Sequence, residues 1–177
     1  MIHELVHNDH PLLRQKMEPF DFSNPPTDPV QLARDLTETM IQNKGLGLSA
    51  NQIGLPYRVF ALSANPVYVC FNPRIVDETQ LNIVLMDEGC LSFPNLFLKI
   101  KRPRTIKVRF VLPNGDTQTQ TFDGMTSRCF QHELDHLNGI VYTDRVSRYH
   151  LDRGMNKKKQ IDRAIKKGLL NVQNQSI

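Results

Sequence analysis

Residues 126–139 read TSRCFQHELDHLNG, and this stretch predicts the helix around which the rest of the fold is built. Phe130, Leu134 and Leu137 recur at the spacing of one helix face, so that face can pack against a core. Gly139 suits the point where such a helix ends. The segment is therefore interpreted as a helix that packs inward.

The polar residues of this helix form a metal-binding pattern. His132 and His136 lie a turn apart on one face, with Glu133 beside them. Such a pair can hold a divalent ion that acidifies its bound water, and the adjacent carboxylate can move the proton. The same HExxH pattern occurs from His3 to His7, but the chain ahead of it is too short to support a helical turn. We interpret the terminal copy as coincidence and the central one as a metal site.

Short β-like runs fill the chain between the two ends. Strands are predicted over 59–62, 68–71, 81–86, 96–100, 105–111 and 117–122. The clearest is the fifth, where Ile106, Val108 and Phe110 alternate with polar residues before the turn sequence PNGD. One face of that sheet is expected to be buried.

Two further helices are predicted, one on each side of the strands. Asp28 can cap a helix over 29–44, and Gly45 can end it in the left-handed conformation. A second, amphipathic helix is expected over 156–170. Its apolar side would consist of Ile161, Ala164, Ile165 and Leu169. The order of helix, strands and helices along the chain indicates an α+β fold. Mixed or antiparallel sheets would surround a central metal-binding helix, with an amphipathic helix at the C-terminus.

Composition narrows the class of protein. The 177 residues suit one domain, and 40% hydrophobic with 23% charged residues is typical of a globular chain. No apolar run approaches the roughly 18 residues of a membrane span. The N-terminus lacks a secretory signal, and three cysteines are an odd number for a disulfide framework. We expect a protein of the cytoplasm or an equivalent reducing compartment, without membrane contact.

Positive charge is concentrated near the C-terminus. Residues 145–168 hold nine Lys or Arg against Asp152 and Asp162, whereas the whole chain carries only +4. Such a segment suits contact with a polyanion, and it equally suits a solvated helix face. We expect a catalytic domain over 1–147 and, as part of the same domain, a basic helical extension over 148–177.

A catalytic metal usually has three protein ligands, so a third must come from elsewhere in the chain. Glu133 is the last glutamate, and Tyr142 stands where a metzincin would have its third histidine. Cys90, within the sequence DEGCLS, is the strongest candidate. Cys70, in an apolar run, and Cys129, on the helix, fit small core or pocket residues better.

A glycine-containing segment, GLGLSANQ, follows the first long helix and ends at Gln52. Its glycines allow the backbone to approach a ligand closely, but it lacks the lysine of a phosphate-binding loop. The amide of Gln52 could donate a hydrogen bond to a developing oxyanion.

Taken together, GLGLSANQ, EGCLS and QHELDH resemble the three motifs of the peptide deformylase family in order and spacing over nearly the whole chain. This family removes the N-formyl group from the initiator methionine of nascent chains and releases formate. The metal ligands that the resemblance implies are Cys90, His132 and His136. It also implies that Glu133 is the general base and acid, and that the Gln52 amide and the backbone N–H of Leu91 stabilise the oxyanion.

The resemblance further implies a cofactor and partners. Family members usually hold ferrous iron, and the same ligands accept zinc, nickel or cobalt. The substrate would be an N-formylmethionyl nascent peptide lying as an added strand, with methionine in an apolar pocket. The residues implied to bind it are Leu46, Gly47, Met86, Gly89, Met125 and Cys129. The basic helix would contact the ribosome and its RNA.

Several other positions near the motifs bear on this interpretation. Glu88, Arg102 and Asp135 could support the metal ligands or form ordinary ion pairs. Three positions depart from the usual family pattern, namely Ser49, Phe97 and Arg128. Ser49 could place a hydroxyl near the substrate strand where alanine is usual. Phe97 replaces an arginine near the substrate backbone, so peptide preference could differ, and Arg128 could narrow or charge the pocket rim.

Two other functions remain open from the sequence. An HExxH metallopeptidase would need a third ligand other than Cys90. A basic ribosome-binding or RNA-binding protein would hold its metal for structure alone.

Overall fold

The computed structural model describes residues 1–78 and 82–170. The three α-helices are α1 (Pro29–Gln42), α2 (Gly124–Leu137) and α3 (Arg148–Lys166). The strands are β1 (Gly47–Ser49), β2 (Val59–Leu62), β3 (Tyr68–Glu78), β4 (Ile83–Cys90), β5 (Phe93–Pro103), β6 (Thr105–Val111) and β7 (Thr117–Asp123). Short 3-10 helices are η1 (Pro11–Arg14), η2 (Ala50–Ile53) and η3 (Tyr142–Arg145). Residue 81, the first of one predicted strand, lies outside the described residues.

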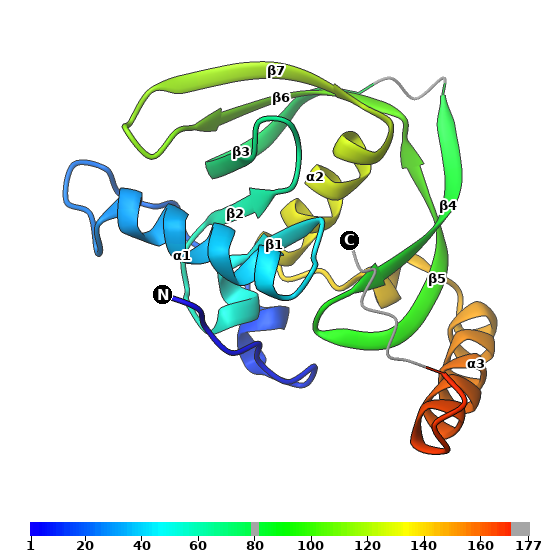
Figure 1. Cartoon of the computed structure of the whole chain (residues 1–177). Coiled ribbons are helices and arrows are strands. Elements are labelled where there is room, and N and C mark those ends of the chain that lie inside the picture. Colours follow the sequence, from blue (N-terminus) through cyan, green and yellow to red (C-terminus); the bar gives the residue numbers. More distant parts are fainter. Residues whose placement is uncertain (79–81, 171–177) are drawn as a thin grey trace.

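The strands form two antiparallel sheets. Five of them pair in the order β1-β2-β3-β6-β7, and β4 pairs with β5 in a separate ribbon. The helix α2 lies between the five-stranded sheet and this ribbon (Figure 1). The predicted α+β architecture around a central helix is thus confirmed.

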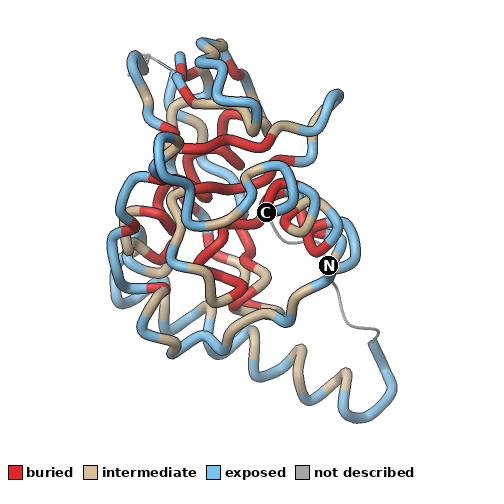
Figure 2. Tube along the Cα trace, turned by 90° about the vertical axis from the view of Figure 1, so that its left-hand side faces the viewer, coloured by how far each residue is buried: buried red, intermediate tan, exposed pale blue. Residues whose placement is uncertain are grey.

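The central helix is buried along most of its length. Every residue from Ser127 to Leu137 is buried. Phe130 and Leu134 pack with Phe60 and Phe110 of the five-stranded sheet in the main apolar core. The polar side of α2 is closed off by the ribbon, and buried segments fill the middle of the molecule in Figure 2. Polar groups that are removed from water in this way need partners, and the functional site consists largely of those partners.

The first helix begins as predicted but ends differently. Asp28 caps it by accepting a hydrogen bond from the N–H of Val30 at 2.9 Å, and Pro29 is its first residue. The left-handed residue after the helix is Lys44, with φ of 57°, so the prediction for Gly45 was wrong. Gly45 is instead required by close packing, because a Cβ there would lie 2.7 Å from Cδ1 of Leu91.

The last helix starts earlier than predicted, at Arg148, and ends earlier, at Lys166. Ser147 caps its N-terminus, and Gly154 lets it approach β5, since a Cβ there would lie 2.6 Å from Cδ2 of Leu98. No residue of α3 is fully buried, and Leu169, expected on its apolar side, lies beyond it and is 73% exposed. Among the described residues, no helix has the length and apolarity needed to cross a membrane.

Candidate metal centre

Cys90, His132 and His136 meet where the end of β4 faces α2. Their candidate ligand atoms lie within 4.8 Å of one another, and all three residues are buried. Sγ of Cys90 is 3.2 Å from Nε2 of His136. Nε2 of His132 is buried without a hydrogen-bond partner among the described residues. One thiolate and two imidazoles form a donor set that fits a divalent transition metal.

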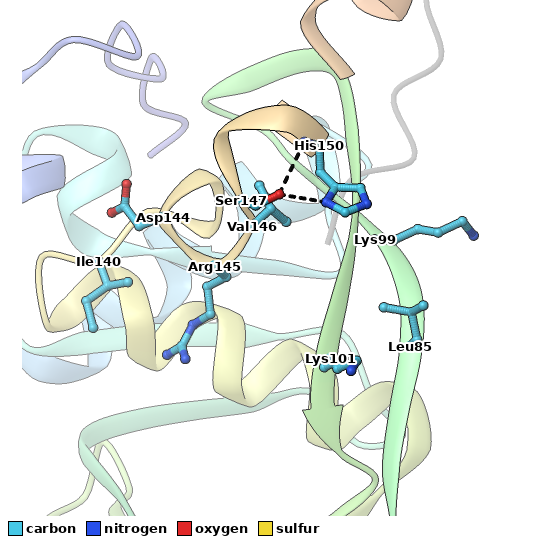
Figure 3. Close-up of a pocket in the computed structure, with 9 residues that line it drawn as sticks. All are labelled: Leu85, Lys99, Lys101, Ile140, Asp144, Arg145, Val146, Ser147 and His150. Atoms are coloured by element: carbon cyan, nitrogen blue, oxygen red, sulfur yellow. Dashed lines mark hydrogen bonds between the residues drawn. The ribbon is translucent and has the colours of Figure 1, made fainter. Parts of the chain in front are cut away.

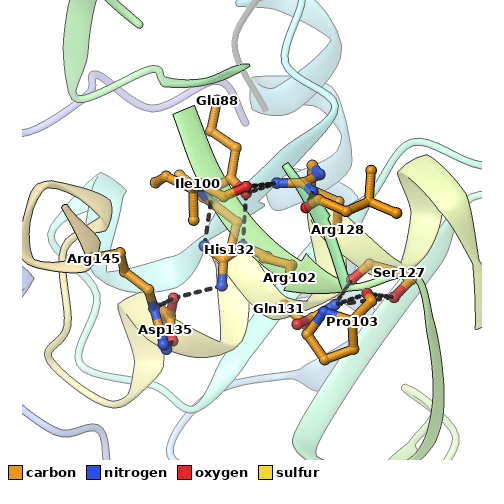
Figure 4. Close-up of polar contacts among 11 residues, drawn as sticks. Glu88, Ile100, Arg102, Pro103, Ser127, Arg128, Gln131, His132, Asp135 and Arg145 are labelled. Carbon is orange, nitrogen blue, oxygen red and sulfur yellow. Dashed lines mark hydrogen bonds and ion pairs between the residues drawn. The ribbon is translucent and has the colours of Figure 1, made fainter. Parts of the chain in front are cut away.

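A network of buried ion pairs around Glu88 contacts the candidate ligand His132 (Figure 4). Glu88 contacts Nδ1 of His132 at 3.2 Å and accepts hydrogen bonds from Arg102 Nε at 2.7 Å and Nη2 at 2.9 Å. Nη1 of Arg102 reaches Asp135 at 2.9 Å, and Asp135 also accepts from Nε of Arg145 at 2.8 Å. Burial alone would raise the pKa of Glu88, but its bonds to His132 and Arg102 outweigh burial and hold that pKa well below its usual range. An ionised Glu88 can fix the ring orientation of His132.

Glu133 lies beside the three candidate ligands and is wholly buried. The hydroxyl of Ser49 donates a hydrogen bond to its carboxylate. Gly47 lies directly against it, because a Cβ at that position would be 2.8 Å from both Cγ and Cδ of Glu133. Burial raises the pKa of Glu133 to about 7, against the opposing effects of His132 and the Ser49 hydrogen bond. A carboxyl group with a pKa near neutrality is suited to take up and return a proton.

Gln52 is held in one orientation by its neighbours. Its side-chain oxygen accepts a hydrogen bond of 2.9 Å from the backbone N–H of Ser49. Its Nε2 therefore points toward Sγ of Cys90, at 3.5 Å, and Oγ of Ser92, at 3.3 Å. The amide presents a donor to the cluster, as an oxyanion-stabilising group requires.

Comparison with known proteins agrees with this arrangement. Residues 2–151 match the family model described as polypeptide deformylase. The chain belongs to the polypeptide deformylase family. Members of this family are hydrolases that remove the N-formyl group from nascent chains, and the metallopeptidase and non-enzymatic alternatives find no support.

Individual relatives cover different shares of the chain. It is 36% identical to a peptide deformylase of Agrobacterium fabrum over 149 residues, which are 80% of this chain and 85% of that protein. It is 38% identical to one of Microchaete diplosiphon over 122 residues, spanning 65% of that relative's length. The Thermus thermophilus peptide deformylase structure matches with a TM-score of 0.81 and 31% identity, covering 96% of this chain and 100% of that one. The structure of a Synechococcus elongatus peptide deformylase in complex with actinonin matches with a TM-score of 0.81 and 32% identity. The match covers 89% of this chain and 86% of that one.

Arg128, one of the departures from the usual deformylase pattern, lines with Met86 a small pocket of about 90 Å³ at the start of α2, but most of its side chain lies inside the fold. It is only 3% exposed and points beneath the β4–β5 ribbon. Its Nη1 contacts Oε1 of Glu88 at 2.5 Å and the carbonyl of Ile100 at 3.0 Å, and Nη2 donates to the carbonyl of Val84 at 2.7 Å. The long side chain finds backbone acceptors there, so Arg128 is an internal link between α2 and the ribbon.

Ser49 and Phe97 are the other two departures from the usual family pattern. Ser49 faces α2, so its hydroxyl contacts Glu133 where a contact near the substrate strand was expected. Phe97 lies on β5 and is partly buried. The alternation of β1, which puts Gly47 and Ser49 on one face, could have indicated their shared contact with the helix.

The residues implied to bind substrate are not all brought together. Met86 and Met125 are 37% and 43% exposed, and Met86 lines a small pocket of about 90 Å³ at the start of α2. Cys129 is instead buried in the core beside Phe130. Leu46 immediately precedes β1, and Gly89 lies near the end of β4.

A larger hollow of about 520 Å³ lies elsewhere, where the ribbon meets the start of α3 (Figure 3). It is lined by Leu85, Lys99, Lys101, Ile140, Asp144, Arg145, Val146, Ser147 and His150. None of the candidate metal ligands, and neither Glu133 nor Gln52, is among these residues. Size therefore does not identify the site in this protein, and the chemistry of the side chains does.

Proposed function

We propose that Cys90, His132 and His136 bind a divalent metal and that Glu133 is the general base and acid of N-formylmethionine hydrolysis. The observation that carries this proposal is the convergence of the three ligand atoms within 4.8 Å, beside a buried carboxylate. A metal held there supplies Lewis acidity.

Glu133 performs the proton transfers in this scheme. It removes a proton from water as the water oxygen bonds to the formyl carbon. The carbon–nitrogen bond then breaks, and Glu133 returns the proton to the departing amine nitrogen. The products are formate and a free α-amino group. The raised pKa of Glu133, about 7, supports both directions of transfer.

Two donors would stabilise the negative charge that develops on the formyl oxygen. Nε2 of Gln52 faces the cluster from η2, and the backbone N–H of Leu91 follows Cys90 directly in the chain. Fixed donors of this kind act where charge develops and need no reorganisation during the reaction. The hydrogen bond from Ser49 that orients Gln52 supports its role.

The nascent peptide would bind as an added strand beside Leu46, Gly47 and Gly89. β1 is an edge strand of its sheet, and β4 is an edge of the two-stranded ribbon. Free edges offer backbone groups to an extended peptide. The methionine side chain would contact Met86 and Met125, which are partly exposed, whereas Cys129 lies in the core.

We further propose ferrous iron as the native metal, with zinc, nickel and cobalt able to occupy the same donors. Cys70, Cys90 and Cys129 are free and buried, which suits the cytoplasm or an equally reducing compartment.

The basic helix is proposed to contact ribosomal RNA as an extension, 148–177, of the catalytic domain, 1–147. Lys157 and Lys159 are exposed on α3, whereas Lys158 pairs with Asp162. Replacing Lys157, Lys158 and Lys159 should weaken ribosome binding and flatten its salt dependence. Unchanged binding would contradict this part of the proposal.

The experiment is formate release from a formyl-methionyl peptide by protein loaded with ferrous iron in the absence of oxygen. We expect release by the wild type, and at least a hundredfold less from Glu133→Ala and Cys90→Ala. Cys70→Ala is the matched control, because this buried thiol lies in the core outside the cluster. Peptide-bond cleavage without formate release would overturn the proposal.

A further inference from the structure

Ser49 lies between two of the groups proposed to act on substrate. It ends β1, pairs with Phe60 of β2, and is wholly buried. Gly47 and Ser49 present the same face of the strand to α2. Ser49 is therefore in direct contact with the helix that carries the candidate ligands.

The two oxygens of the Glu133 carboxylate have different surroundings. Oε2 accepts the hydroxyl hydrogen bond of Ser49. Oε1 is buried with no hydrogen-bond partner among the described residues, and it lies directly against Gly47, where a Cβ would overlap it. One oxygen is thus held by a hydrogen bond, while the other makes none among the described residues.

The same residue also orients Gln52, through its backbone. The N–H of Ser49 holds the oxygen of the Gln52 amide at 2.9 Å, which turns the amide nitrogen toward Cys90. A change of the Ser49 side chain alone removes the contact with Glu133 and keeps the one with Gln52. The two effects can therefore be separated by mutation.

We propose that Ser49 is a positioning residue for the hydrolysis: its hydroxyl fixes Oε2 of Glu133 so that Oε1 is the oxygen that takes and returns the proton. This inference rests on the proposed function of Glu133. A carboxylate rotates readily about its terminal torsion, and a charge-assisted hydrogen bond restricts that rotation. Without the hydroxyl, Glu133 is productively aligned for only part of the time, which lowers turnover more than substrate binding.

The kinetic test compares Ser49→Ala and Ser49→Thr with the wild type, all loaded with ferrous iron. We expect Ser49→Ala to lower kcat about tenfold with KM unchanged, and Ser49→Thr, which keeps the hydroxyl, to recover most of the loss. Ser127→Ala is the matched control, since Ser127 is equally buried on α2 but donates to the carbonyl of Pro103. An unchanged kcat for Ser49→Ala, or an equal loss for Ser127→Ala, would overturn the inference.

A structural test does not depend on turnover. Crystal structures of the wild type and Ser49→Ala should show the Glu133 carboxylate ordered in the first and rotated or in several orientations in the second. Gln52 should stay in place in both. If Glu133 keeps one orientation in the variant, the inference is wrong. If the metal-loaded wild type releases no formate, the proposed function fails and this inference fails with it. Formate release together with an unchanged Glu133 in Ser49→Ala overturns the inference alone.

Discussion

Nε of Arg102 lies 2.7 Å from Oε1 of Glu88, and both side chains are buried, at 3% and 0% exposure. The pair connects the β4–β5 ribbon to α2, because Glu88 also contacts His132 and Arg102 also contacts Asp135. Removing one partner of such a pair leaves an uncompensated buried charge. The pair therefore links the stability of the fold to the geometry of the metal centre.

Replacing Arg102 with Met should destabilise the fold by about 3–5 kcal/mol, since Glu88 and Asp135 would both lose a buried partner. Urea unfolding of the metal-free protein measures the change. Arg104→Met is the control, because Arg104 pairs with Asp123 at 53% exposure and should cost at most about 1 kcal/mol. Equal losses of unfolding free energy in the two variants would show that the buried network stabilises the fold no more than an exposed ion pair does.

Acid should weaken the contribution of Glu88. Its pKa is lower in the folded protein than the ordinary value of 4.5, so its stabilisation is complete above that value and declines as pH falls toward the folded pKa. The difference in unfolding free energy between wild type and Glu88→Gln should therefore be constant at pH 6–7 and shrink below about pH 4.5. A difference that does not vary between pH 3 and 7 would contradict this assignment.

Arg128→Met should cost about 3–5 kcal/mol, because Glu88 loses a buried charge partner and the carbonyls of Val84 and Ile100 lose their donor. Hydrogen exchange should increase along β4 in this variant, since the link from α2 is lost. Protection of β7, on the far side of α2, provides the internal comparison. An unchanged β4 would mean that the ribbon is held without Arg128.

Gln52→Ala should lower kcat by about 10²–10³ with little change in KM, as expected for a donor that acts on developing charge. Gln131→Ala is the matched control. Its buried amide donates to the carbonyl of Pro103 at 2.9 Å, so it should affect stability and leave kcat within about twofold. A loss confined to KM in Gln52→Ala would assign Gln52 to substrate binding.

Removing the metal should lower thermal stability. A ligand present at a hundred times its dissociation constant adds about 2.7 kcal/mol to the folded state. The melting temperature should therefore fall on chelation and recover when ferrous iron is restored without oxygen. Cys90→Ala should show no such response, whereas Cys70→Ala should keep it. A response retained by Cys90→Ala would place the metal elsewhere.

Local sequence patterns predicted the helices and strands that are determined by interactions between residues close together in the chain. The strand Thr105–Val111 follows from strict alternation, and α2 follows from its apolar spacing and the glycine beyond it. The HExxH pattern and the cysteine motif identified side chains that the fold brings together. In each case the sequence signal and the tertiary environment favour the same conformation.

Predictions failed where a distant contact decides the outcome. Gly45 is small because Leu91 packs against it, and α3 extends past Gly154 because β5 lies beneath that glycine. The backbone carbonyls that hold Arg128 belong to Val84 and Ile100 of the ribbon, which are distant from it in the chain. The contact between Ser49 and Glu133 joins positions 84 apart, a separation that no local pattern encodes.

The candidate ligands come from two separate parts of the fold, and Cys90 and His136 are 46 positions apart. An ion held between them would cross-link the chain over that span, much as a disulfide closes a loop. Its loss would free the ribbon to separate from α2, exposing backbone to proteases. We expect the lifetime of this protein in a cell to follow the supply of its metal, so that scarcity removes the molecule as well as its activity.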